Sequence, residues 1–185
     1  VWKASNINLD TKATDDRNIS IISYCSYSVS SSCDLDSTSE PGENVTLTVK
    51  CSEGEECEKA VDYEANDSAG NVNGTRTVSQ IKIDKEDPDP NIESPLSDTT
   101  GGNVSIEVLP TDQGGSGIKD VNYTVYNASN SSQIFDSGDL NQSNSYGVNW
   151  NSSTNITTIQ DVILNVTAED KVGNNHTNQE RFTVD

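Results

Sequence analysis

The sequence is poor in apolar and aromatic residues, which make up 31% and 5% of its 185 positions. A chain with so little apolar surface to bury must be considered for intrinsic disorder. It has no apolar run near the roughly twenty residues that cross a bilayer and no signal-peptide pattern, so we expect no membrane insertion. The chain begins at Val1 instead of Met, which is typical of a processed or partial product.

Basic residues are also scarce, with 11 Lys and Arg against 30 Asp and Glu, for a net charge of -19. Binding to nucleic acid needs a basic patch that displaces counterions, so nucleic acid is not an expected partner. The same charge opposes adsorption to anionic membranes. The one histidine, His176, lies inside a glycosylation sequon, and the carboxylate pair Glu55 and Glu56 sits in a turn. With no candidate nucleophile and base, we expect no enzyme.

The apolar residues that are present arrive in alternating runs rich in Val, Ile and Tyr, which favours a folded chain with half-buried strands over disorder. No long segment has helical periodicity. Strands are expected at residues 19–24, 45–49, 61–65, 77–83, 104–109, 121–126, 133–136, 146–150, 159–166 and 180–184. Short strands at regular spacing predict an all-β chain built as sandwiches or barrels.

Two motifs occur twice. Asp67-Ser-Ala-Gly-Asn71 is echoed by Asp170-Lys-Val-Gly-Asn174, and residues 42–49 are echoed by residues 102–108. Repeated motifs in a fixed order indicate two copies of one β unit. Because closely spaced prolines stiffen a linker, residues 84–91 mark the boundary. We expect an N-terminal extension at residues 1–17, a first domain at 18–86 and a second at 87–185.

Asparagine is the strongest compositional signal. The N-glycosylation sequon Asn-x-Ser/Thr occurs thirteen times, whereas chance predicts roughly five for this composition. In a strand, the Asn and the Ser or Thr share one face and the middle residue takes the other, so sugars would coat the outside. The alternative is that Asn, Ser and Thr are merely abundant surface residues. The sequons begin at Asn18, Asn44, Asn66, Asn73, Asn103, Asn122, Asn127, Asn130, Asn141, Asn151, Asn155, Asn165 and Asn175.

The four cysteines form an even set beside these sequons, which favours two disulfides in an exported protein. Three connectivities are open. We favour the local one, Cys25 with Cys33 and Cys51 with Cys57, because each pair flanks a polar turn that can fold back to a short Cα separation. A zinc site is the rival, but the spacing is not that of a zinc knuckle and His176 lies far away.

A resemblance rests on two stretches of the second unit, residues 111–123 (TDQGGSGIKDVNY) and 168–174 (AEDKVGN). They are similar to the immunoglobulin-like repeat domains of prokaryotic cell-surface proteins. The first unit resembles this family through residues 51–57 and 67–71, whereas residues 1–40 match nothing in it. The resemblance implies tandem immunoglobulin-like β-sandwiches, a fold that serves as spacer, adhesive module or filament subunit.

One metal site is a candidate. Asp112, Asp120 and Asp170 could converge at one end of the second sandwich and hold Ca2+ through carboxylates and loop carbonyls. The alternative is that these aspartates cap turns through their own backbone. No other cofactor is expected.

Spacing between the echoed motifs makes the first unit about 44 residues shorter than the second, so it is short of strands. Residues 19–24 could fill the gap from within, or Val1, Trp2, Ile7 and Leu9 could complete a neighbouring subunit as a donor strand. Head-to-tail use of that contact would build a fibre of identical copies. The sequence therefore favours a structural subunit of a glycosylated extracellular filament or surface assembly, with an archaeal exterior fitting best. The alternative is an adhesion or glycan-binding module of a larger surface protein.

Overall fold

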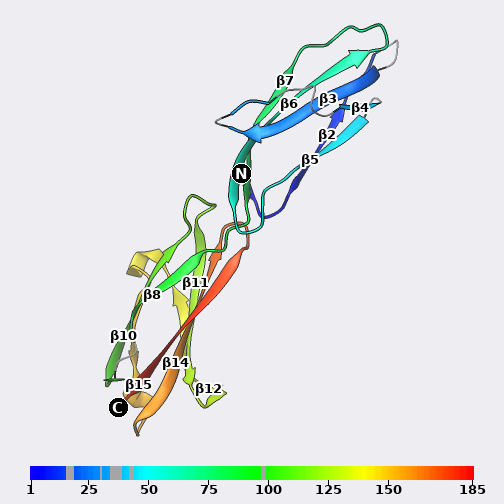
Figure 1. Cartoon of the computed structure of the whole chain (residues 1–185). Helices are drawn as coiled ribbons and strands as arrows, with labels where there is room; N and C mark the ends of the chain where they lie inside the picture. The colour runs from blue at the N-terminus through cyan, green and yellow to red at the C-terminus, as the bar shows by residue number, and fades with distance from the viewer. Residues whose placement is uncertain (16–18, 30, 34–38, 42–43, 97–98) are drawn as a thin grey trace. The chain divides into compact units, whose positions relative to one another are not determined.

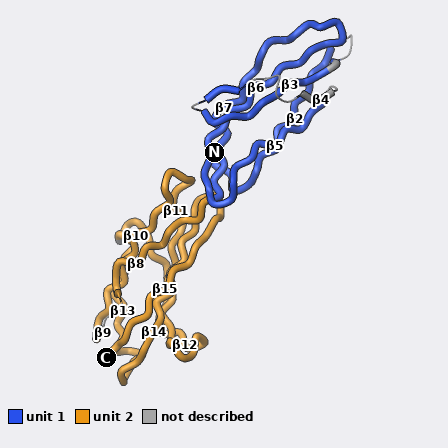
Figure 2. Tube along the Cα trace, viewed as in Figure 1, with its two compact units in different colours: residues 1–85 blue, residues 86–185 orange. Residues whose placement is uncertain are grey.

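The computed structural model describes residues 1–15, 19–29, 31–33, 39–41, 44–96 and 99–185. The described chain is all-β apart from two short 3-10 turns, η2 (Gln142–Asn144) and η3 (Ser152–Thr154). It divides into two compact units, residues 1–85 and 86–185 (Figure 2). No helix in the described ranges is long and apolar enough to cross a membrane.

Unit 1 is a sandwich of a five-stranded and a two-stranded sheet (Figure 1). The larger sheet has the order β1-β7-β6-β3-β4, and the smaller sheet pairs β2 with β5. The bounds are β1 Trp2–Lys3, β2 Ile7–Lys12, β3 Ile19–Ser28, β4 Ser39–Pro41, β5 Asn44–Val49, β6 Glu56–Asp67 and β7 Arg76–Asp84.

Unit 2 is a sandwich of a five-stranded and a three-stranded sheet. The larger sheet has the order β12-β11-β14-β15-β9, and the smaller one β13-β10-β8. The bounds are β8 Asp89–Ser94, β9 Thr99–Thr100, β10 Asn103–Thr111, β11 Ile118–Asn127, β12 Asn130–Leu140, β13 Gly147–Asn151, β14 Gln160–Asp170 and β15 Asn175–Val184.

The two units share one topology. The strand order of the larger sheet is the same in both units: β1-β7-β6-β3-β4 corresponds to β9-β15-β14-β11-β12. In each unit the short edge strand, β1 or β9, runs parallel to the last strand of that unit, β7 or β15. The pair β2-β5 matches β10-β13, so β8 has no counterpart among the described residues of unit 1. This order is that of tandem immunoglobulin-like sandwiches. All ten strands expected from alternation are present, most of them longer than expected.

Alternation within the strands explains where the cores lie. β14 alternates perfectly, with Val162, Leu164, Val166 and Ala168 fully buried and the residues between them partly exposed. These side chains pack with Trp150, Phe182 and the inward residues of β10 and β11 in one continuous core. Unit 1 has two smaller clusters, one around Val49 and Ile83 and one around Ile22. Unit 2 therefore has the larger core.

The structure corrects the expected N-terminal extension. Trp2 pairs with Lys82, and β2 pairs antiparallel with β5 from Ile7 opposite Val49 to Lys12 opposite Asn44. Ile7 and Leu9 pack against the core of their own unit. β1 and β2 thus belong to the first domain, as β3 does. Trp2, Ile7 and Leu9 are paired within their own unit and are not held free for a neighbour, whereas Val1 is exposed.

Two further expectations are corrected. The echo of residues 42–49 in residues 102–108 suggested equivalent strands, but β5 corresponds to β13 and β10 corresponds to β2. Any strand with outward Asn and Thr gives the same pattern, so the echo did not identify partners. The proline-rich residues 87–91 also do not form only a linker, since β8 begins at Asp89 and sets Pro90 opposite Pro110. Prolines are tolerated there because β8 is an edge strand.

Both disulfides have the local connectivity. Cys25 is bonded to Cys33 and Cys51 to Cys57, with Cα separations of 6.1 and 5.9 Å. No free cysteine remains.

Candidate functional site: the sequon asparagines

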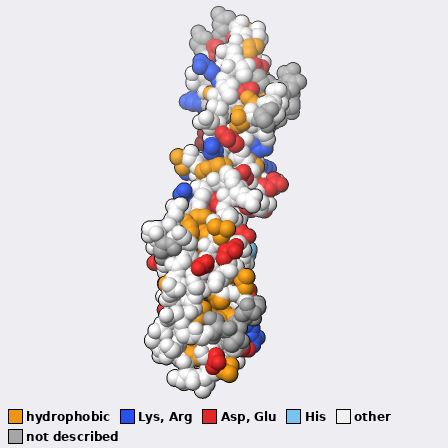
Figure 3. Space-filling view, turned by 90° about the vertical axis from the view of Figure 1, so that its left-hand side faces the viewer, with side chains coloured by type: hydrophobic (Ala, Val, Ile, Leu, Met, Phe, Trp, Pro, Cys, Tyr) orange, Lys and Arg blue, Asp and Glu red, His pale blue; other side chains and the backbone are white. Residues whose placement is uncertain are grey.

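The sequon asparagines within strands face outward, as expected. In β5, Asn44, Thr46 and Thr48 are exposed whereas Val45, Leu47 and Val49 are buried. β10 repeats this arrangement, with Asn103 exposed at the first position of the strand and Val104, Ile106 and Val108 buried. Figure 3 shows one face of the molecule, which is mostly covered by uncharged polar side chains and backbone with small, interrupted apolar patches. The outer faces of the strands are therefore open to covalent modification.

Two sequons lie directly opposite each other on the outer face of the larger sheet of unit 2. Asn122 of β11 stands opposite Thr167 of β14, and Thr124 stands opposite Asn165. Each sequon hydroxyl thus faces the asparagine of the other sequon. Glycans on Asn122 and Asn165 would leave the same sheet face from diagonal positions, whose Cα atoms are roughly 7–8 Å apart.

A second pair of sequon asparagines meets across β10 and β13 in the smaller sheet of unit 2. Asn103 and Asn151 are directly opposite each other, and both are exposed. Their neighbours Val104 and Trp150, which are also opposite each other, point into the core. Both sheets of unit 2 therefore carry neighbouring sequon asparagines on their outer faces.

Other sequons lie in turns that the asparagine itself stabilises. The Oδ1 atoms of Asn127, Asn130 and Asn141 accept the backbone N–H two residues later, at 2.8, 3.2 and 3.1 Å. This is the Asx turn, in which the side chain imitates a backbone turn. It occupies the oxygen of the amide and leaves the nitrogen, the atom that carries an N-glycan, out of that bond.

Exposure separates the sequons into two groups. Among the twelve with described side chains none is buried, and Asn66, Asn127 and Asn165 are half-buried. The amide oxygen of Asn66 is buried without a hydrogen-bond partner in the described structure. Asn155 donates from Nδ2 to the Phe135 carbonyl at 2.7 Å. Asn18 lies outside the described residues. The nine exposed sequons are Asn44, Asn73, Asn103, Asn122, Asn130, Asn141, Asn151, Asn155 and Asn175.

The repeated Asp-x-x-Gly-Asn motif forms the same hairpin in both units. Asp67 Oδ1 accepts the backbone N–H groups of Ala69 and Asn71 at 2.8 Å each, and Oδ2 accepts Asn71 Nδ2 at 2.6 Å. Hydrogen bonds from the side chain and then the backbone of Asn71 hold the pKa of Asp67 below its usual range. Gly70 occupies the left-handed region with φ 86°, which favours glycine.

In unit 2, Asp170 is fully buried and caps the matching turn. Its Oδ1 accepts three backbone N–H groups, from Val172, Gly173 and Asn174, at 2.9, 2.6 and 2.9 Å. Its Oδ2 accepts the side-chain amide of Asn174 at 2.8 Å. Both oxygens are thus committed to the hairpin, as the turn-capping alternative expected.

The three aspartates considered for calcium do not converge as a set. A carboxylate oxygen of Asp112 lies within 4.8 Å of one of Asp170, but Asp112 accepts the N–H of Gly117 across its own loop. Asp120 binds the backbone N–H of its neighbour Val121 at 3.0 Å. All three carboxylates thus accept backbone N–H groups within their own segments, which is the arrangement that the turn-capping alternative expects.

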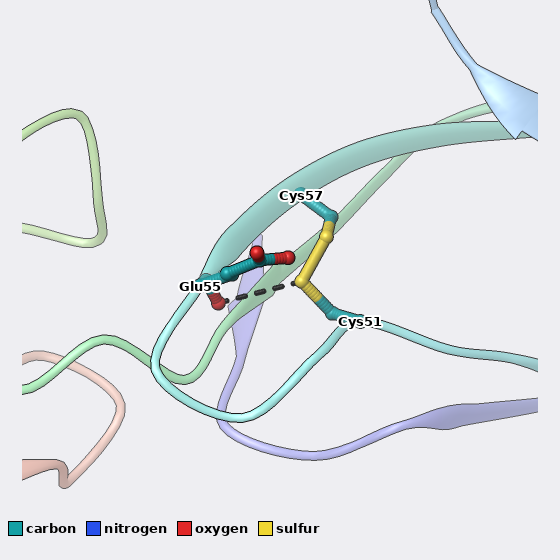
Figure 4. A group of neighbouring side chains, drawn as sticks. All are labelled: Cys51, Glu55 and Cys57. Carbon is teal, nitrogen blue, oxygen red and sulfur yellow. Dashed lines mark hydrogen bonds between the residues drawn. A yellow bond between two sulfur atoms is a disulfide. The ribbon is translucent and has the colours of Figure 1, made fainter.

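Potential metal-ligand atoms also lie close together in Cys51, Glu55 and Cys57 (Figure 4). The two sulfur atoms are joined as a disulfide, so neither is a thiolate available to a metal. The Sγ atom of Cys51 lies 3.3 Å from the Glu55 carbonyl oxygen. The group is a disulfide-closed turn, in agreement with the choice of disulfides over zinc.

The two tryptophans considered for sugar stacking and the histidine considered for catalysis do not form a site together. Trp150 is 3% exposed and packs against Phe135 and Phe182 at centroid distances of 6.3 and 6.4 Å. Trp2 is half-buried beneath the Lys82 ammonium, 5.1 Å from its ring centroid. His176 is exposed on β15. The described side chains thus provide no open aromatic platform at either tryptophan.

One perturbed group was not expected from the sequence. The Tyr123 hydroxyl donates to Asp136 Oδ2 at 2.9 Å from a side chain only 6% exposed. Burial, reinforced by this carboxylate, raises the pKa of Tyr123 to about 12. Only the pairing of β11 with β12 brings the two residues together, so no local pattern could have indicated them.

Comparison with known proteins gives a fold likeness alone. No protein-family description matches the sequence, and no curated protein matches it. Among solved structures, the chain is similar to the crystal structure of the chicken CNTN1 FN1–FN3 domains, with a TM-score of 0.45 and 10% identity. The match covers 98% of this chain and 62% of that one. The class of protein, tandem immunoglobulin-like β-sandwiches, rests on the strand order described above.

Proposed function

We propose that this chain is a non-catalytic structural component of an N-glycosylated extracellular assembly, at a cell surface or in a filament. The observation that carries the proposal is the placement of the sequons. All twelve with described side chains avoid the core, and paired asparagines meet on the outer faces of both sheets of unit 2. Abundant polar residues alone would not require thirteen sequons where chance predicts roughly five.

Other features support an exterior location. Two disulfides are typical of oxidising compartments. Immunoglobulin-like sandwiches generally serve as spacers and binding modules, with function grafted onto the surface. The committed oxygens of Asp170 and the buried ring of Trp150 offer neither a reactive carboxylate nor a sugar platform. Assembly in this proposal does not use residues 1–10 as a donor strand, because β2 belongs to its own unit.

The test is the mass of the native protein, followed by mapping of the modified peptides. We expect a mass well above the 19.9 kDa of the polypeptide, with sugars on exposed sites such as Asn103 and Asn122. An unmodified mass would overturn the proposal. Electron microscopy of the same material tests the structural role, since regular fibres or lattices support it. A monodisperse monomer that binds a glycan array would instead favour the adhesion module.

A further inference from the structure

An apolar row crosses the outer face of the larger sheet of unit 2. Tyr126 of β11 stands opposite Ile134 of β12 on one side and Ile163 of β14 on the other. Each of the three adjoins a buried residue of its own strand, so its side chain lies on the outer face. Ile134 is 59% exposed, and the other two are half-buried. This Tyr126 row thus presents one aromatic ring between two aliphatic side chains.

The sequon asparagine Asn165 lies in the next row of the same face. It stands opposite Thr124 of β11 and Gln179 of β15. It is therefore diagonal to Tyr126, at a distance that aromatic side chains span across a sheet. Along its own strand it is two residues from Ile163, a rise of about 7 Å. A sugar ring attached to Asn165 is thus within reach of the Tyr126 row.

The position of Asn165 limits where such a sugar can go. β14 is the central strand of the order β12-β11-β14-β15-β9, so a sugar on it starts between two flanking strands and cannot turn off an edge of the sheet. The Oδ1 atom of Asn165 accepts a hydrogen bond from Gln179 Nε2 at 2.8 Å. This bond directs the oxygen branch of the planar amide toward β15. The nitrogen branch, which carries an N-glycan, therefore lies on the side away from β15.

On that side, β11 offers two diagonal neighbours to a sugar on Asn165. One is Asn122, an exposed sequon asparagine whose own sugar would occupy the space above it. The other is Tyr126. The C–H groups of a pyranose ring pack favourably against the negative face of an aromatic ring, and the flanking isoleucines add apolar contact area. The Tyr126 row is therefore the favoured direction.

We infer that Tyr126 docks the oligosaccharide of Asn165, with the first pyranose ring lying over the Tyr126 row. The inference rests on the glycosylation proposed above and deepens it, because it gives one sugar a fixed place on the protein. Covalent attachment supplies a high effective concentration, so a contact that is weak between free molecules is populated here. The docked sugar covers the exposed apolar row and adds a contact between β11 and β14.

The first test is NMR spectroscopy of the native glycoprotein. We expect nuclear Overhauser contacts between the ring protons of Tyr126 and the first sugar on Asn165, whose resonances should be shifted upfield by the ring current. The sugar on Asn103, which lies in the smaller sheet opposite Asn151, is the internal control and should show neither effect. An Asn165 sugar without contact to the ring would overturn docking, and so would a ring contacted only by a sugar on Asn130.

The second test is a double-mutant cycle on the folding equilibrium of the glycosylated chain. Tyr126→Leu keeps an apolar side chain and removes the ring face, whereas Asn165→Gln removes the sugar. We expect Tyr126→Leu to lower the folding equilibrium constant about fivefold more when the Asn165 sugar is present than when it is absent. Asn122→Gln, which removes the neighbouring sugar, is the matched control and should leave the effect of Tyr126→Leu unchanged. Additive effects of the first two substitutions would overturn the inference.

Peptide mapping separates failure of this inference from failure of the proposed function. Sugars on other sequons with Asn165 unmodified would overturn the docking role of Tyr126 and leave the glycoprotein proposal standing. A chain without any sugar would overturn both.

Discussion

Removal of the Asp170 carboxylate tests whether the repeated motif is a structural cap. In Asp170→Ala, three backbone N–H groups and the Asn174 amide lose their acceptor in a fully buried position. Hydrogen bonds to a charged group are worth about 1.5–3 kcal/mol each, but the released donors partly rehydrate. The substitution also relieves repulsion from the nearby Asp112 carboxylate, which is about 3.5 kcal/mol for unit charges 4.8 Å apart at an effective dielectric constant of about 20. We expect a net loss of about 2–3 kcal/mol in the free energy of unfolding of unit 2.

Calorimetry of the full chain measures this loss, which should lower the melting temperature of unit 2 by about 10–20 °C. Asp170→Asn keeps an acceptor oxygen and should lose less. Glu169→Ala, which removes a half-buried partner of the exposed Lys119, is the control and should cost less than about 1 kcal/mol. The reasoning fails if Asp170→Ala melts like the control. A deficit seen only with added calcium, and abolished by chelation, would instead assign Asp170 to a metal.

Three further predictions concern other parts of the two units. The pKa of Tyr123 is raised to about 12, so its contribution to the free energy of unfolding is complete below about pH 10 and is lost as the pH rises through 12. In Tyr123→Phe, the free energy of unfolding measured by urea titration should therefore fall less between about pH 10 and pH 12. Trp150→Phe removes a buried indole N–H without a partner in the described structure, so it should cost much less than the about 3–5 kcal/mol of Trp150→Ala, measured by denaturant unfolding. Replacing Cys25 and Cys33 by alanine opens a loop with a separation of 8 residues and should cost about 2 kcal/mol, and an unchanged denaturation midpoint would contradict that figure.

The sequence predicted the fold class because unit 2 carries its core in plain alternation. The buried positions of β14, from Val162 to Ala168, repeat every second residue, which is the period of a strand and not of a helix. β1, β4 and β9 were not predicted, because two or three residues are too few for a period. β8 was missed because its prolines indicate a linker unless the strand is known to lie at an edge.

The candidate sites were predictable only as far as they are local. Outward placement of Asn44 and Asn103 follows from alternation, and the local disulfides follow from short polar turns. The opposition of Asn122 with Thr167 and the contact of Tyr123 with Asp136 both depend on which strands pair. In unit 1, motif spacing predicted a shortage of strands, because β2 has only Ile7 and Leu9 as apolar residues and was not recognised as a strand of the sandwich.

The opposed sequons of β11 and β14 have a consequence for folding. A slip of one residue between these strands would exchange the two faces, bringing Asn122 or Asn165 inward and Tyr123 or Val166 outward. An unmodified asparagine pays only a desolvation penalty for that error, whereas an asparagine that carries a hydrophilic oligosaccharide has no room between the sheets. In the glycoprotein proposed above, each sugar would therefore oppose a shift in strand register by steric exclusion, because it raises the energy of the misaligned sheet more than that of the native one.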